Sequence, residues 1–172
     1  AGNLKHEYYL AKSVDVLENY VTQVVPDYWL NFDRRDLYER RHVFRIQPEN
    51  SNRDLWVNFQ SKGEINPLHC HSGILSFVMY IKIPYTLEEE ASRESVAKGG
   101  APVAGTFNIV YPGFHQPGGV SSLKIDTDKN FERKMIVFPA ETQHMVYPFY
   151  TSNSYRVSVA VSYTHLTLPT KA

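Results

Sequence analysis

Residues 55–83, LWVNFQSKGEINPLHCHSGILSFVMYIKI, contain the pattern that decides the fold. The two ends of this stretch, Leu55–Gln60 and Ile74–Ile83, are rich in Val, Ile, Phe and Tyr, and Gly, Asn and Pro lie between them. Such runs are typical of short strands bounded by turns. The stretch therefore predicts two strands, and it places His69 and His71 on the extended chain just before the second of them.

The same two-residue period recurs along the rest of the chain. It predicts six further strands, over Val43–Ile46, Thr106–Tyr111, Ser121–Asp126, Lys134–Phe138, His144–Tyr150 and Tyr155–Val161. Short strands separated by turn signals favour a sandwich or barrel over parallel βαβ units. The segment Glu88–Gly105, which is charged and rich in Gly and Ala, is predicted to be a long surface loop.

The N-terminal part has a different period. From Glu7 to Val25, apolar residues recur every three or four positions, which predicts an amphipathic helix that ends at Pro26. Asp33–Arg41 is predicted to add a second short helix. We therefore expect one mainly β domain over residues 1–162, with a helical part at about 7–41 packed on a β-barrel core at about 43–162.

Composition limits the classes of partner. The 172 residues include 18 Lys+Arg and 18 Asp+Glu, so the formal net charge is zero. Binding to nucleic acid or to anionic lipid needs a basic excess, so neither partner is expected. A single cysteine, Cys70, excludes an internal disulfide framework and favours a reducing, cytoplasmic location. Residues 163–172 resemble translated adapter sequence at the end of a metagenomic gene, and we expect them to be a non-native tail.

Three histidines indicate a metal site. His69 and His71 are two positions apart on an extended chain, so they point to one face, and His144 begins another predicted strand. Three neutral imidazoles from two strands could bind a divalent transition metal and leave coordination positions open. The alternative, a pair of surface or hydrogen-bonded histidines, stays open from this motif alone.

A possible carboxylate receptor lies on the last predicted strand. Arg156 and Ser158 share one face, and a guanidinium fork beside a hydroxyl is well suited to a carboxylate. A buried Arg requires an anion, which could be a ligand or a core Asp or Glu in a structural ion pair. A metal and a carboxylate receptor together are what a 2-oxo acid cosubstrate requires.

The order of these motifs resembles a known family, the small bacterial and phage branch of the 2-oxoglutarate/Fe(II) dioxygenases. The resemblance covers about residues 55–161 and is carried by Trp56-Val57-Asn58, His69-Cys70-His71, Leu75-Ser76-x-Val78-x-Tyr80, Phe138-Pro139-x4-His144-x-Val146-x-Pro148 and Arg156-x-Ser158. It implies a double-stranded β-helix (jelly-roll, cupin-like) barrel, a hydroxylase activity and the cofactors Fe(II) and 2-oxoglutarate.

The resemblance also implies roles for individual residues. His69 and His144 would be metal ligands, Arg156 with Ser158 would bind the distal carboxylate of 2-oxoglutarate, and Asn58 and Tyr80 would be further cosubstrate contacts. For Asn58 and Tyr80, a purely structural role as strand polar group and core aromatic stays open.

One position departs from the wider superfamily, which has His-x-Asp or His-x-Glu where this chain has His71. His71 would either complete a three-histidine site or leave that position to water or substrate. Glu141 is a weaker carboxylate donor, since a turn residue there faces solvent. Cys70 alternates away from the ligands and is expected to be a small buried hydrophobe. His115, in a turn-rich loop, is a candidate substrate contact.

Two other functions compete with the oxygenase. A cupin-type isomerase, non-oxoglutarate dioxygenase or small-molecule binder fits the spacing of the histidines, although the Glu expected beyond His71 is replaced by Leu75 and Ser76. A non-catalytic binding module is the third class. The expected substrate of the oxygenase is a small molecule or a peptide, and the sequence leaves the oligomeric state open.

Overall fold

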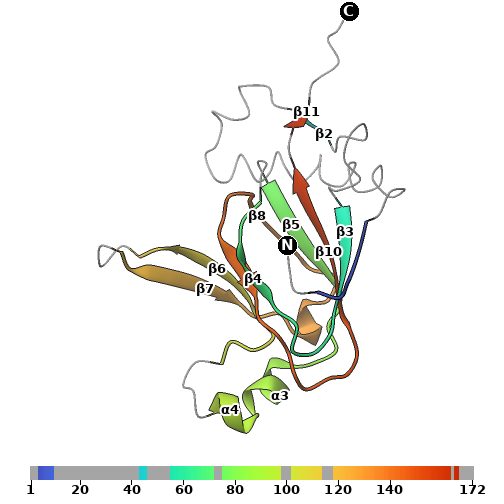
Figure 1. Cartoon of the computed structure of the whole chain (residues 1–172), viewed down its shortest axis with the longest axis vertical. Coiled ribbons are helices and arrows are strands. Elements are labelled where there is room, and N and C mark those ends of the chain that lie inside the picture. Colours follow the sequence, from blue (N-terminus) through green and yellow to red (C-terminus); the bar gives the residue numbers. More distant parts are fainter. Residues whose placement is uncertain are drawn as a thin grey trace, which may run out of the picture.

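The computed structural model describes residues 4–9, 43–45, 55–71, 75–97, 102–113, 118–163 and 165–166. Within these ranges the chain forms two main antiparallel sheets, seen in Figure 1. The first has the order β1 (His6–Tyr9), β3 (Leu55–Gln60), β10 (Arg156–Tyr163), β5 (Leu75–Lys82) and β8 (Met135–Pro139). The second has the order β4 (Asn66–His69), β9 (His144–Val146), β6 (Phe107–Pro112) and β7 (Val120–Ile125). A separate pair joins β2 (Val43–Arg45) to β11 (His165–Leu166).

The mainly β, jelly-roll-like class predicted from the sequence is confirmed. Several neighbouring strands are distant in sequence, since β10 lies between β3 and β5 and β9 lies between β4 and β6. Of the predicted strands, Leu55–Gln60 has the observed bounds, and the strand predicted over Tyr155–Val161 runs on to Tyr163. The short strand β4, which carries His69, was not predicted, because Asn66 and Pro67 have low strand propensity.

The predicted N-terminal helix is wrong at its start. Residues Glu7–Tyr9 belong to β1, whose register pairs Glu7 with Asn58 on β3. The open edge of β3 offers backbone donors and acceptors that a short segment with two tyrosines can use, and this tertiary pairing outweighs a local helical period. The remainder of that helix and the short helix predicted over Asp33–Arg41 lie outside the described residues.

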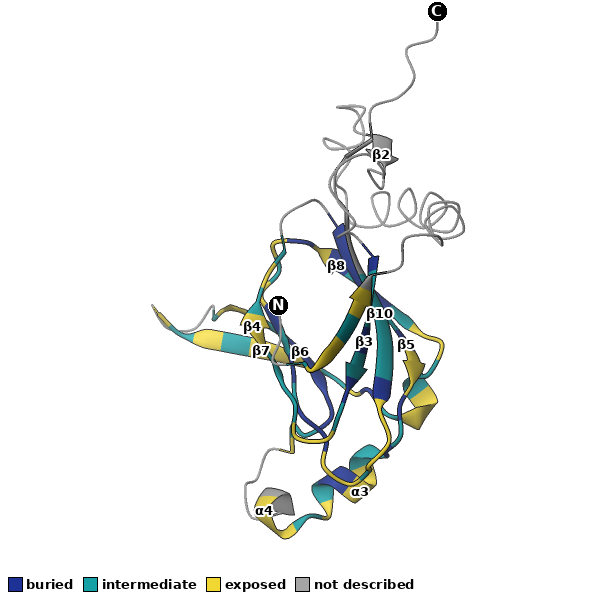
Figure 2. Ribbon diagram, turned by 45° about the vertical axis from the view of Figure 1, so that its right-hand side comes forward, coloured by how far each residue is buried: buried dark blue, intermediate teal, exposed yellow. Residues whose placement is uncertain are grey.

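The hydrophobic core fills the space between the two sheets. It includes Val78 and Tyr80 from β5, Phe138 from β8, and Phe107 and Val146 from β6 and β9. The strands that carry the core, such as β5, are mostly buried, whereas β7, at the sheet edge, is coloured largely as exposed in Figure 2. Each fully buried side chain of this size stabilises the fold by about 1.5–3 kcal/mol.

The predicted surface loop over Glu88–Gly105 is only partly a loop. It contains α3 (Leu87–Ala91) and α4 (Glu94–Ala97), and α3 begins at a capping box formed by Thr86 and Glu89. Glu90 is 1% exposed, and its Oε1 accepts hydrogen bonds from the Tyr150 and Thr151 amides. The buried carboxylate thus attaches the helix to the loop that precedes β10. Among the described residues, no helix has the length and apolar character needed to cross a membrane.

Candidate metal centre and carboxylate pocket

Three histidines converge at the ends of two paired strands. His69 ends β4 and lies opposite His144, the first residue of β9, while the His71 amide donates to the Ala140 carbonyl at 2.8 Å. The ring centroids are 4.2 Å apart for His69 and His144, 4.9 Å for His69 and His71, and 5.1 Å for His71 and His144. One ligand atom from each lies within 4.8 Å of the others. The predicted convergence of the three imidazoles is therefore present.

Hydrogen bonds orient two of the rings. The Nδ1 of His69 lies 2.6 Å from the Pro67 carbonyl, and the Nδ1 of His144 lies 2.9 Å from the Thr142 carbonyl. Because a carbonyl only accepts, each Nδ1 carries the proton, and Nε2 keeps a lone pair for a metal. The His144 ring is further held between Phe107, stacked at 5.4 Å, and Phe138, tilted at 4.7 Å.

The three imidazoles are neutral at physiological pH. Burial lowers the pKa of His144 to about 4, and burial together with the two neighbouring imidazoles lowers the pKa of His71 to about 4. Burial also lowers the pKa of His69. Metals bind the unprotonated ring, so this donor set fits Fe(II), for which imidazole is a suitable ligand.

The same pocket contains every residue predicted for cosubstrate binding. It encloses about 570 Å³ of empty space, part of it open to solvent. Its lining includes the predicted site residues His69, His71, His144, Asn58, Tyr80, Arg156 and Ser158. A row across the first sheet places Asn58 beside Ser158 and Ser158 beside Tyr80, so all three project from adjacent strands. The pocket thus joins the histidine cluster to the predicted carboxylate receptor.

Arg156 is 1% exposed, and all its N–H groups are engaged. Its Nε and Nη2 both donate to Gln60 Oε1, and Nη2 also donates to the Tyr147 carbonyl at 3.0 Å. Its Nη1 donates to the Tyr85 hydroxyl and, at 3.0 Å, to the Gly105 carbonyl. These acceptors are all neutral, so the alternative of a structural ion pair is wrong for the described residues. The guanidinium charge has no countercharge from them, and a ligand carboxylate could supply one.

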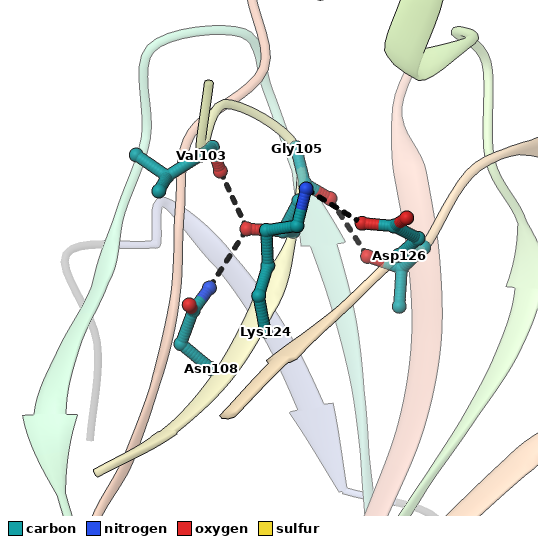
Figure 3. Close-up of polar contacts among 7 residues, drawn as sticks. Val103, Gly105, Asn108, Lys124 and Asp126 are labelled. Atoms are coloured by element: carbon teal, nitrogen blue, oxygen red, sulfur yellow. Dashed lines mark hydrogen bonds and ion pairs between the residues drawn. The ribbon is translucent and has the colours of Figure 1, made fainter. Parts of the chain in front are cut away.

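The carbonyl of Gly105 supports the guanidinium. It also accepts from the Tyr85 hydroxyl at 2.6 Å and from Thr127 Oγ1 at 2.7 Å. Figure 3 shows the surrounding network, in which the Thr106 hydroxyl donates to Val103 and Asn108 donates to Thr106. Gly105 has a φ of 77°, and a Cβ there would lie 2.5 Å from the Tyr85 ring, so only glycine fits this position.

Tyr80 and Asn58 differ in what they can offer a ligand. The Tyr80 side chain is 1% exposed, burial raises its pKa to about 12, and its hydroxyl has no hydrogen-bond partner among the described residues. With its amide oriented to satisfy both neighbours, Asn58 donates to Glu7 Oε2 at 3.0 Å and accepts from Trp56 Nε1 at 3.2 Å. Tyr80 therefore keeps a free donor, while the Asn58 amide is already engaged.

Other predictions at the site have mixed outcomes. Cys70, which directly follows β4, is exposed, so its predicted burial is wrong; as predicted, it is not among the residues that line the pocket. Glu141 is exposed, as expected, and does not belong to the histidine cluster. His115 lies outside the described residues.

Three polar residues of the pocket were missed by the sequence reasoning. Gln60 is two positions from Asn58 on the same strand, so strand alternation applied from Asn58, which the family resemblance had indicated, could have found it. Glu7 was hidden by the helix prediction, and Asn66 by the missed strand β4.

A jelly-roll-like pair of sheets with a three-histidine cluster and a buried arginine in one pocket defines a β protein with a candidate metal site. The sequence model of the family described as "Putative 2OG-Fe(II) oxygenase" matches residues 54–162. The chain belongs to this 2-oxoglutarate/Fe(II) oxygenase family, as its motifs had indicated. No curated protein matches the chain.

Proposed function

We propose that this protein is a 2-oxoglutarate- and Fe(II)-dependent dioxygenase that hydroxylates a small-molecule or peptide substrate. In this reaction O₂ oxidises both 2-oxoglutarate, which becomes succinate and CO₂, and a substrate C–H bond, which becomes C–OH. The observation that carries the proposal is the single pocket that contains both the neutral histidine cluster and the buried Arg156. A cupin-type binder has no special use for this arginine.

His69, His71 and His144 would hold the iron. The bound iron and 2-oxoglutarate would together supply the activation of O₂ for attack on a C–H bond. The protein contributes three neutral donors oriented before the metal arrives, since the Pro67 and Thr142 carbonyls fix two of the rings. With imidazole in place of the usual carboxylate, this metal site carries one more positive charge than that of most relatives.

Arg156, Ser158 and Tyr80 would hold the distal carboxylate of 2-oxoglutarate. The Gln60 oxygen bridges Nε and Nη2 of Arg156, which is the edge that a carboxylate binds in bidentate fashion. We propose that the cosubstrate carboxylate takes the place of this oxygen, and that the free Tyr80 hydroxyl donates to it. Asn58 stays a predicted cosubstrate contact, although its amide already serves Glu7 and Trp56.

The test combines metal binding with turnover. Protein purified without O₂ should bind one Fe(II) per chain and, on aeration with 2-oxoglutarate, should form succinate. His144→Ala should lower the affinity for Fe(II) more than tenfold, whereas His6→Ala, which removes an exposed histidine of β1, should leave it unchanged. A folded protein that binds no Fe(II), or that binds it but never converts 2-oxoglutarate to succinate with any substrate panel, would refute the proposal.

A further inference from the structure

A carboxylate stands in the pocket without an assigned role. Glu7 lies on β1, the edge strand that pairs with β3, and it is half-buried among the residues that line the pocket. It is not one of the side chains whose ligand atoms form the metal cluster. Two residues before Glu7, the backbone N–H of Lys5 donates to Glu64 Oε1 at 3.4 Å, which ties this end of the chain to the turn after β3.

Among the described residues, the Glu7 carboxylate has a hydrogen-bond donor but no countercharge. Its Oε2 accepts a hydrogen bond from the Asn58 amide at 3.0 Å. Within the described part of the chain, no Lys or Arg forms an ion pair with Glu7, and its second oxygen accepts no hydrogen bond. A half-buried carboxylate in this state has lost part of its hydration, and a cationic ligand would restore the lost interaction.

Two other residues that line the pocket, Trp56 and Asn66, would also attract a cation. Trp56 is oriented by the hydrogen bond from its indole N–H to Asn58, and its ring lies 5.7 Å from the His71 ring. Asn66, which lines the pocket from β4, has a buried Oδ1 that accepts no hydrogen bond from any described residue. A carboxylate, an indole ring and an unpaired carbonyl oxygen are all groups that attract an N–H-rich cation.

We propose that Glu7, with Trp56 and Asn66, binds a cationic group of the prime substrate, and that the substrate class is a basic amino acid, free or within a peptide. An ammonium or guanidinium would pair with Glu7, lie against the indole and donate to the Asn66 oxygen. This inference rests on the proposed function only in naming the bound molecule as the substrate. Asn58 is then a positioning residue, because it orients both Glu7 and Trp56.

The experiment measures binding of matched probes by calorimetry in the absence of O₂. The probes are Nα-acetyl-L-lysine methylamide, Nα-acetyl-L-arginine methylamide and Nα-acetyl-L-norleucine methylamide; the last is the lysine probe without its ammonium. The full chain is titrated both alone and with Mn(II) and 2-oxoglutarate. We expect at least one cationic probe to bind about ten to a hundred times more tightly than the norleucine probe, as hydrogen-bonded charge pairs allow.

Variants of the chain test whether Glu7 causes the tighter binding of the cationic probes. Glu7→Gln should remove it, whereas Glu88→Gln, which removes the same charge from an exposed position in α3, should retain it. Trp56→Leu is a second variant in case Glu7→Gln does not fold, and it should weaken the cationic probes more than the norleucine probe.

Other results would overturn the inference. These are equal or absent binding of the cationic and norleucine probes by the wild-type protein, an unchanged preference in Glu7→Gln, or a loss of Mn(II) binding in Glu7→Gln, which would make Glu7 a metal ligand. A cationic preference in a protein that binds neither Mn(II) nor 2-oxoglutarate would instead refute the proposed function and leave this inference standing.

Discussion

The sharpest test of the carboxylate pocket is Gln60→Glu, which changes one amide nitrogen to oxygen. In the structure, Gln60 Oε1 accepts from Nε and Nη2 of Arg156, and Gln60 is itself only 5% exposed. The substitution therefore places a permanent carboxylate on the edge of the guanidinium that we assign to 2-oxoglutarate. Wild-type protein has a neutral acceptor there, which an incoming anion can replace.

The size of the effect follows from the ion pair that the variant creates. To bind in the proposed place, 2-oxoglutarate must separate a buried, hydrogen-bonded charge pair, which costs about 2–5 kcal/mol. We take the lower end, because the new carboxylate also faces the Glu64 carbonyl, to which the Gln60 amide donates in the wild type. A cost of about 2 kcal/mol corresponds to roughly thirtyfold weaker binding of 2-oxoglutarate.

The assay is anaerobic calorimetry of 2-oxoglutarate binding to Mn(II)-loaded protein. Gln60→Glu should bind Mn(II) as the wild type does, since Gln60 contacts none of the three histidines. Asn130→Asp adds the same charge at an exposed position and should leave both affinities unchanged. If Gln60→Glu bound 2-oxoglutarate within threefold of wild type, the carboxylate would not dock on this edge of Arg156, and the reasoning would be refuted.

Three further substitutions test other parts of the structure. Tyr80→Phe removes a buried hydroxyl without a partner, so it should leave the melting temperature nearly unchanged but weaken 2-oxoglutarate binding about tenfold or more in calorimetry. Gly105→Ala forces a side chain against Tyr85 at a φ of 77° and should cost about 2 kcal/mol or more, lowering the melting temperature by at least about 4 °C. Glu90→Ala removes the acceptor of the Tyr150 and Thr151 amides and should cost about 2–4 kcal/mol in denaturant unfolding.

Each of these expectations has an opposing result. If Tyr80→Phe bound 2-oxoglutarate as tightly as the wild type does, the Tyr80 hydroxyl would not be a contact of the cosubstrate. A melting temperature within a degree of wild type would contradict the steric argument at Gly105. For Glu90, the exposed Glu88→Ala is the matched control in the same helix, and an equal effect of the two would show that burial of Glu90 does not matter.

The sequence could predict much of the fold because strand alternation is a local property. The period of two is set by the backbone of each strand, whatever the strand pairs with. It was therefore possible to place Arg156 and Ser158 on one face, and His69 and His71 on another, before the pairing was known. The spacing of the motifs then indicated the family, which the match over residues 54–162 shows.

The sequence predictions were wrong where another segment of the chain determines the secondary structure or the burial of a residue. The apolar period after Glu7 favoured a helix, but the open edge of β3 pairs with His6–Tyr9. Cys70 was predicted to be buried, but it directly follows β4 and is exposed, because none of the described elements covers it. Glu90 lies in a charged segment that reads as surface, yet the amides of the loop before β10 hold it in the interior.

The sequence by itself determined the inward-facing residues, the histidine donors and the family, because these depend on residue type and on spacing along the chain. Only the tertiary structure decided the partners of Arg156 and the entry of Glu7 into the pocket. Both result from pairing between segments that are far apart in sequence, through the register of β10 on β3 and of β1 on β3. Local periodicity fixes the face to which a side chain points, whereas strand pairing fixes the group that it meets there.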